Sequence, residues 1–166
     1  MKILVTFFSQ TGNTEKIARA IYDAIDTQKD LAPLSSAPDC AEYDLVFCGF
    51  PVHAHSVPPV VQPFITALAS NQKLAIFSTH GSLRNNQLAR TAIEHAVGIA
   101  SHTTVLGTFG CRGEVQQHII DALSKKLENK AWCEEAQSAA GHPDDADCSD
   151  AHDFARAMVA KARSHT

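Results

Sequence analysis

Residues 3–25 read ILVTFFSQTGNTEKIARAIYDAI and place an apolar run, a polar loop and an amphipathic stretch in direct succession. The run at Ile3–Phe8 is continuously apolar, which is typical of a strand buried on both faces of a parallel sheet. From Ile17 to Ile25, apolar residues recur with the i, i+3, i+4, i+7 spacing of one helix face. The stretch therefore predicts a strand, a loop and a helix that covers the sheet.

The same alternation continues along the chain. Further strands are expected at Leu45–Phe50, Leu74–Phe77, Thr104–Phe109 and, more weakly, near Leu31–Leu34, where Pro33 confines the strand to a sheet edge. Helices are expected over Val60–Leu68, with Pro63 near its first turn, over Leu88–Ala96, over Val115–Leu127 and after the N-cap Asp147. This order predicts an α/β fold with a doubly wound parallel sheet, in a single domain spanning residues 1–166. In such sheets, ligands bind in the loops that follow the strands.

Composition excludes several classes of protein. The 166 residues include 14 Lys and Arg against 18 Asp and Glu, a net charge of −4, and lack the basic stripe that nucleic-acid binding requires. The first apolar run is shorter than the roughly 7–15 residues of a signal peptide, and no run approaches the ~18 residues of a membrane span. The five cysteines are odd in number and lack C-x-x-C spacing, which favours reduced thiols and a cytoplasmic location.

The first loop, SQTGNT at Ser9–Thr14, has the composition of an anion site. Free backbone N–H groups at a helix N-terminus favour an anion, and three hydroxyl side chains add further donors. The loop contains no Lys or Arg, and neither the Walker nor the G-x-G-x-x-G pattern is present. A single phosphate is therefore the expected ligand. The simpler alternative is a Ser/Thr-rich turn that only caps the helix.

The loop resembles the phosphate loop of the flavodoxin family, T/S-x-T-G-x-T, and matches it at Ser9, Thr11, Gly12 and Thr14. The resemblance implies a flavodoxin-like sheet with strand order 2-1-3-4-5 and FMN as the cofactor. It also implies that the protein carries electrons, with a separate redox protein or reductase as its partner. By the same resemblance, the phosphate would be held by Ser9, Gln10, Thr11, Gly12, Asn13 and Thr14.

Two further loops are similar to the family's flavin-ring loops. GFPVHAHSVPP at residues 49–59 implies ring contacts from Pro51, Val52, His53 and Ala54, with His55 stacking on the ring or flanking it. The loop after the fourth strand implies contacts from Thr79, His80 and Gly81, and the loop after the fifth places Cys111 and Arg112 near the same rim. The alternatives are a rigid surface turn for the second loop and a turn that caps a helix at Asn85 for the third. The chain departs from the family because its Trp132, Tyr22 and Tyr43 lie outside these loops.

Three other functions are weighed against an electron carrier. A flavin-dependent NAD(P)H or quinone reductase could share the fold, although the sequence has no nicotinamide fingerprint. A metal protein could use the three imidazoles of His53, His55 and His80 as ligands. A phosphoacceptor receiver is excluded because Ser9 and Gln10 stand where acidic residues are required.

Overall fold

Five parallel strands form one sheet at the centre of the molecule. The computed structural model describes residues 1–83 and 86–164. The strands are β1 (Lys2–Phe7), β2 (Gln28–Pro33), β3 (Leu45–Pro51), β4 (Lys73–His80) and β5 (Thr104–Arg112). They pair in the order β2-β1-β3-β4-β5, and every neighbouring pair is parallel. The doubly wound sheet and the strand order expected from the sequence are confirmed.

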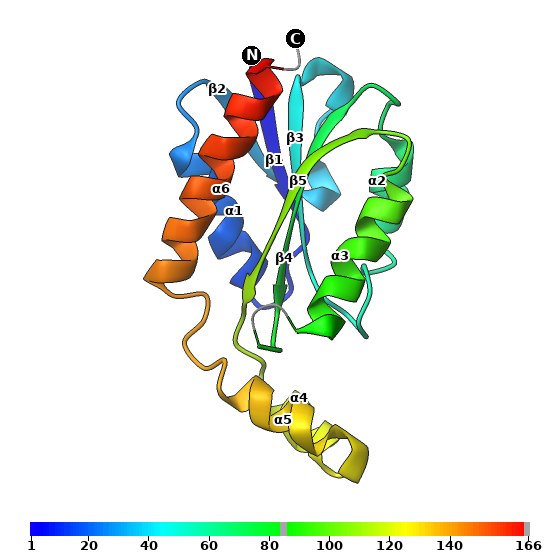
Figure 1. The fold of residues 1–166 in the computed structure, drawn as a ribbon, viewed down its shortest axis with the longest axis vertical. Coiled ribbons are helices and arrows are strands. Elements are labelled where there is room, and N and C mark those ends of the chain that lie inside the picture. The colour runs from blue at the N-terminus through cyan, green and yellow to red at the C-terminus, as the bar shows by residue number, and fades with distance from the viewer. Residues whose placement is uncertain (84–85, 165–166) are drawn as a thin grey trace.

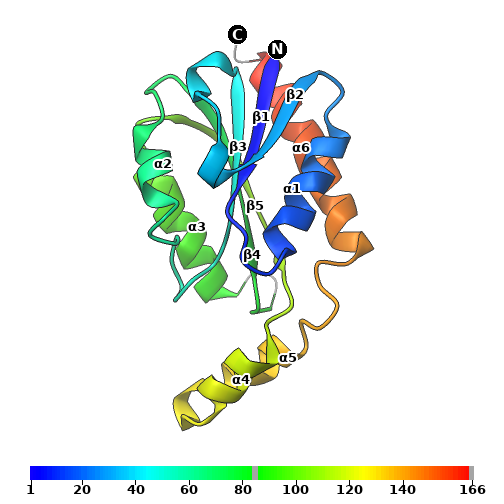
Figure 2. The ribbon, with the colours of Figure 1, turned by 180° about the vertical axis from the view of Figure 1, so that it is seen from behind.

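Helices cover both faces of the sheet (Figures 1 and 2). Helices α1 (Asn13–Ala24) and α6 (Asp145–Ser164) pack on one face, and α2 (Gln62–Ala67) and α3 (Gln87–Ile99) pack on the other. Two short 3₁₀ turns, η1 (Leu34–Ser36) and η2 (Cys40–Glu42), follow β2. Successive strand side chains point to opposite faces, so Ile3 and Val5 join the core under α1 and α6, whereas Leu4 joins the other core.

Strand pairing fixes where the loops begin. β2 is an edge strand that ends at Pro33, as expected, and Phe7 of β1 is paired with both Pro33 and Gly49. β4 and β5 run beyond their expected ends, because pairing between them continues to His80 and Arg112. Thr79 and His80 are therefore strand residues rather than loop residues.

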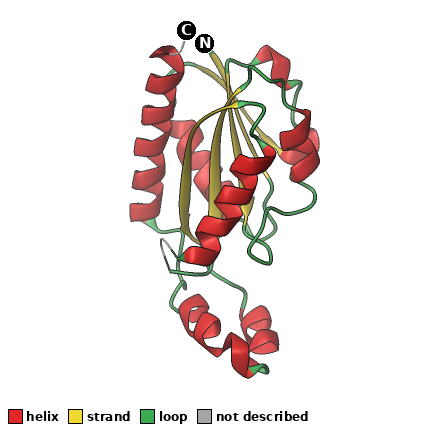
Figure 3. Cartoon of the chain, turned by 45° about the vertical axis from the view of Figure 1, so that its right-hand side comes forward, coloured by secondary structure: helices red, strands yellow, loops and turns green. Residues whose placement is uncertain are grey.

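The helix expected over Val115–Leu127 is wrong as a single element. The structure has α4 (Gln117–Ser124), the 3₁₀ turn η3 (Leu127–Asn129) and α5 (Lys130–Gln137). The apolar spacing continues into Leu127, but that side chain is 87% exposed, so no core is available there to extend the helix. Asn129 Nδ2 instead donates to the carbonyl of Leu123 near the end of α4. Residues 117–137, called the arm below, lie apart from the layers on the sheet (Figures 1 and 3).

Two other helix boundaries differ from expectation. Helix α6 begins at Asp145 because Asp144 and Asp147 cap its start reciprocally, each backbone N–H donating to the other's carboxylate at 3.0 Å. Helix α2 begins at Gln62 with Pro63 in its first turn, so Val60 precedes the helix and is exposed. The expected cap at Asn85 lies outside the described residues.

The described cysteines are all free thiols, as expected from their spacing. Burial raises the pKa of the Cys48 thiol to about 12, which makes it an unreactive core residue. None of the described helices is both long enough and apolar enough to cross a lipid bilayer.

Candidate cofactor-binding site

The first loop leaves its backbone donors free. Gly12 adopts a positive φ of 92°, a conformation that suits glycine, and its N–H donates to Ser9 Oγ at 3.1 Å. Helix α1 then starts at Asn13 without a side-chain cap, which argues against a turn that only caps the helix. Among the described residues, the N–H groups of Gln10 and Thr11 have no hydrogen-bond partner. The first-turn amides of α1 likewise have no carbonyl one turn earlier to bond.

Two buried hydroxyl groups join the first loop to β4. Thr14 and Thr79 are 1% and 3% exposed, and their Oγ1 atoms are 2.8 Å apart. One of the two hydroxyl hydrogens forms this bond. The other hydroxyl hydrogen remains available to donate to a ligand.

The second loop bends back sharply after β3. Val52 donates its N–H to the carbonyl of Thr79 at 2.9 Å, and His53 and Ser56 exchange two backbone hydrogen bonds. Between them, Ala54 and His55 adopt positive φ angles of 45° and 62°, which non-glycine residues rarely do. His53 packs edge-on against Phe8, with ring centroids 6.2 Å apart, and burial lowers its pKa from 6.5.

The third loop approaches the arm closely. His80 is buried, and its Nδ1 lies 3.0 Å from the carbonyl oxygen of Ser82. At Gly81, an added Cβ would lie 2.4 Å from a methyl carbon of Val115 and 3.7 Å from Trp132. A side chain at this position would require Val115, just before the arm, to move.

These loops border one pocket of about 410 Å³. The structure brings together in its lining every site residue predicted from the sequence except Gly12: Ser9, Gln10, Thr11, Asn13, Thr14, Pro51, Val52, His53, Ala54, Thr79, His80 and Gly81. Gly12 shapes the loop without lining the pocket. His55 is exposed and does not line it either.

One wall of the pocket was not predicted from the sequence. It is formed by Gly113, Glu114, Val115, Gln116, Ile119, Leu123 and Trp132. Asn13 Nδ2 donates to the carbonyl of Glu114 at 2.9 Å, which fixes the start of this segment against the first loop. Trp132 comes from α5, 20 residues beyond Arg112 of the last loop that was expected at the rim. The helical apolar spacing from Val115 was the available signal, but it did not show which face would meet the pocket.

Cys111 and Arg112 do not lie at the pocket rim. Cys111 is fully buried in β5, and neither residue lines the pocket. The guanidinium of Arg112 donates to the carbonyls of Glu135 and Ser138 at 2.7 and 3.0 Å. Arg112 therefore holds the end of α5, the helix that carries Trp132.

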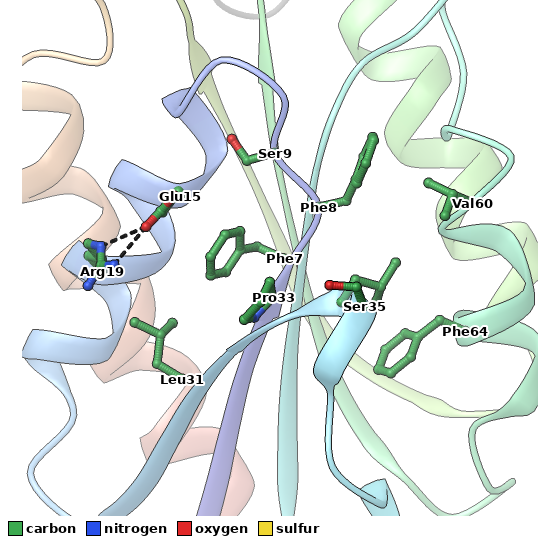
Figure 4. A pocket seen from close by; sticks show the side chains of 11 residues that line it. Phe7, Phe8, Ser9, Glu15, Arg19, Leu31, Pro33, Ser35, Val60 and Phe64 are labelled. Carbon is green, nitrogen blue, oxygen red and sulfur yellow. Dashed lines mark hydrogen bonds and ion pairs between the residues drawn. The ribbon is translucent and has the colours of Figure 1, made fainter.

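A larger pocket of about 760 Å³ lies between α1, the end of β2 and the start of α2 (Figure 4). Its lining is mostly apolar and includes Phe7, Phe8 and Phe64. Its two charged side chains, Glu15 and Arg19, pair with each other at 2.7 Å. It thus lacks the free donors of the first loop, although it shares Ser9 with the smaller pocket.

The three-histidine metal site is not supported. Within the described part of the chain, the side chains close enough to share a metal ion are His142, Asp144 and Asp147. His53, His55 and His80 form no such group there. Asp147 already accepts hydrogen bonds from the backbone of Asp144 and contacts His142, so this cluster has a structural role in capping α6.

A family model and a curated relative each match most of the chain. A family model described as a flavodoxin domain matches residues 4–156. A flavodoxin-like domain-containing protein, BilS of Clostridioides difficile, is 30% identical to the chain, and the match covers 98% of both proteins.

Solved structures share the fold. A short-chain flavodoxin associated with a bacterial microcompartment aligns with a TM-score of 0.68 at 14% identity, over 98% of this chain and 99% of its own. A flavoprotein from Lactobacillus acidophilus, solved in complex with FMN, aligns with a TM-score of 0.56 at 18% identity, over 66% of this chain and 92% of its own.

Proposed function

Because this chain belongs to the flavodoxin family, we propose that it binds FMN in the pocket that Trp132 borders and carries electrons between separate redox proteins. FMN is the cofactor, and when bound it supplies the oxidation and reduction. One observation carries the proposal: the free donors of the first loop and the side chains suited to a flat ring border the same pocket. The chain's own part is to bind, orient and shield the cofactor.

The first loop holds the phosphate. Its unpartnered N–H groups and the positive end of α1 stabilise a dianion, although residues 9–14 themselves include no Lys or Arg. With Thr79 as the donor in their hydrogen bond, the Thr14 hydroxyl keeps its own hydrogen and supplies a further donor to the phosphate. Gly12 permits the turn that aims these groups into the pocket.

The remaining walls hold the ring. Residues 51–54 border it on one side, and Thr79, His80 and Gly81 border it on another. Trp132 adds an indole ring from α5 to the imidazole rings of His53 and His80 that the ring loops bring to the pocket. Among the described residues of the lining, the one carboxylate is that of Glu114, and it accepts a hydrogen bond from the Gly141 N–H at 3.1 Å. Apart from Glu114, the described lining would surround a bound ring with uncharged or histidine side chains.

The lining favours a carrier over a nicotinamide-dependent reductase. Among the described residues that border the pocket, none is Lys or Arg. A dinucleotide brings several phosphate charges, for which basic side chains are the usual partners. The described part of the lining thus provides for one phosphate on backbone donors, without a cationic side chain for a second.

The test uses the FMN-loaded protein under anaerobic conditions. After chemical reduction, it is mixed with oxidised cytochrome c, and the haem absorbance is followed. We expect rapid haem reduction, and no oxidation of NADH or NADPH beyond that of free FMN. Steady consumption of either nucleotide by the protein alone would identify a reductase. A reduced protein that passes no electrons to the haem would refute the carrier function.

A further inference from the structure

The arm has a surface that the cofactor site does not account for. It carries its own small core of Ile120, Cys133 and Ala136, separate from the two cores on the sheet. Its base is fixed, because the Glu135 carboxylate accepts from the Leu83 N–H at 3.2 Å. Its far end projects away from the sheet (Figures 2 and 3).

Exposed apolar side chains run from the pocket wall to the far end of the arm. Three of the six exposed large hydrophobic side chains among the described residues belong to the arm: Ile119, Leu123 and Leu127. Ile119 and Leu123, one helical turn apart on α4, also line the cofactor pocket. Leu127 follows at 87% exposure, an unusual state for a leucine that gains stability when buried.

Lysines surround the exposed leucine. Lys125, Lys126 and Lys130 are all exposed, with Glu128 the only acid in the same six-residue segment. As far as the structure describes the chain, none of the three ammonium groups forms an ion pair. Residues 125–130 thus carry a net charge of +2 on a chain whose net charge is −4, whereas the rest of the arm carries the acids Asp121, Glu134 and Glu135.

We propose that the end of the arm, at residues 123–130, is the docking surface for an acidic redox protein, which receives Leu127 in an apolar pocket bordered by carboxylates. The proposal rests on the proposed carrier function. The acidity of the partner follows from charge complementarity. The lysines in residues 125–130 attract an acidic protein to this segment, while the acidic remainder of the chain repels the same protein. The apolar strip ends at the cofactor pocket, so a protein docked on the arm lies beside the cofactor.

The experiment measures electron transfer from the reduced, FMN-loaded protein to two haem proteins, the acidic cytochrome b5 and the basic cytochrome c. A charge-reversal variant of the arm, Lys125→Glu with Lys126→Glu, is compared with Arg156→Glu with Arg163→Glu. The second pair lies on the exposed side of α6 and changes the net charge by the same amount. Rates are taken at low and high ionic strength.

We expect the rate to cytochrome b5 to fall with added salt, and to fall about tenfold at low salt in the arm variant. The control variant should change this rate less than about twofold, because its charges lie far from the docking surface. Leu127→Ser should also lower the rate by about tenfold, and this loss should persist at high salt. Equal effects of the two charge variants, or no effect of the arm variant, would overturn the proposal.

Other occupants of the arm give separate results. Wild-type protein that sediments with phosphatidylserine vesicles, while Leu127→Ser does not, would assign the arm to a membrane surface and overturn the proposal. If sedimentation velocity shows a wild-type dimer and a monomeric arm variant, the arm surface binds a second copy of the chain, and the proposal is overturned. Failure to reduce either cytochrome would refute the carrier function and the docking surface together. If electron transfer proceeds and neither the charge reversal nor Leu127→Ser changes its rate, the docking surface alone is refuted.

Discussion

Removing the Thr14 hydroxyl tests the phosphate assignment at one atom. Thr14→Val keeps the shape of a side chain that is 1% exposed and deletes only its hydrogen-bonding group. A hydrogen bond to a charged group contributes about 1.5–3 kcal/mol, so the FMN dissociation constant should rise about ten- to a hundredfold. Riboflavin has the same ring but no phosphate, so its dissociation constant should change much less.

The same substitution has a second, separable effect. It leaves the Thr79 hydroxyl, 3% exposed, without the partner that now lies at 2.8 Å. An unsatisfied buried hydroxyl costs about 1–3 kcal/mol of unfolding free energy. Thr79→Val breaks the same hydrogen bond from the other side and serves as the matched control.

The assay is a titration of the apoprotein with FMN and with riboflavin, followed by quenching of flavin fluorescence, on the wild type and both variants. Chemical denaturation of the apoproteins measures the stability loss. We expect both variants to lose similar stability, but only Thr14→Val to lower the preference for FMN over riboflavin. An unchanged FMN-to-riboflavin ratio in Thr14→Val would refute the assignment of the phosphate to this hydroxyl.

Three further predictions concern the core and the pocket. Gly49→Ala should lower the unfolding free energy by about 1–3 kcal/mol in chemical denaturation, because the new Cβ would lie 2.1 Å from the ring of Phe77; an unchanged midpoint would contradict the packing. Cys111→Ser should lower stability by about 1–3 kcal/mol and leave FMN affinity and electron transfer unchanged, since the thiol is fully buried; loss of transfer with FMN still bound would point to thiol chemistry. Burial lowers the pKa of His53, so protonation of this side chain is less favourable in the folded than in the unfolded state, and the protein should lose stability as the pH falls below about 6.5. His53→Gln should flatten this loss of unfolding free energy between pH 7 and pH 5. Identical pH profiles of stability in the wild type and the variant would contradict the burial of His53.

The centre of the sheet could be predicted from the sequence because β1, β3 and β4 are buried on both faces. Such strands are continuous apolar runs, and the helix after Gly12 has a clear apolar stripe. The exact ends of β4 and β5 could not be predicted, because strand pairing rather than apolar character extends them to His80 and Arg112. The start of α6 was misplaced for a similar reason. Two aspartates three residues apart can each serve as a cap, and only the backbone geometry distinguishes them.

The predicted loops form the pocket together, but the wall from the arm was not predicted. Parallel strands bring their carboxyl ends to one edge of the sheet, so loops after β1, β3 and β4 could be placed without coordinates. The position of Trp132 depends instead on long-range contacts, such as those of Arg112 with the end of α5. No local pattern in the sequence encodes such contacts.

If the pocket holds FMN, the purified protein should carry the cofactor. This is tested by the visible absorption spectrum of the purified protein, followed by mass identification of the chromophore released on denaturation. We expect an oxidised flavin spectrum, FMN as the released molecule and one equivalent per chain. A colourless protein whose apo form takes up no FMN in titration, or one that releases a chromophore other than FMN, would contradict this expectation.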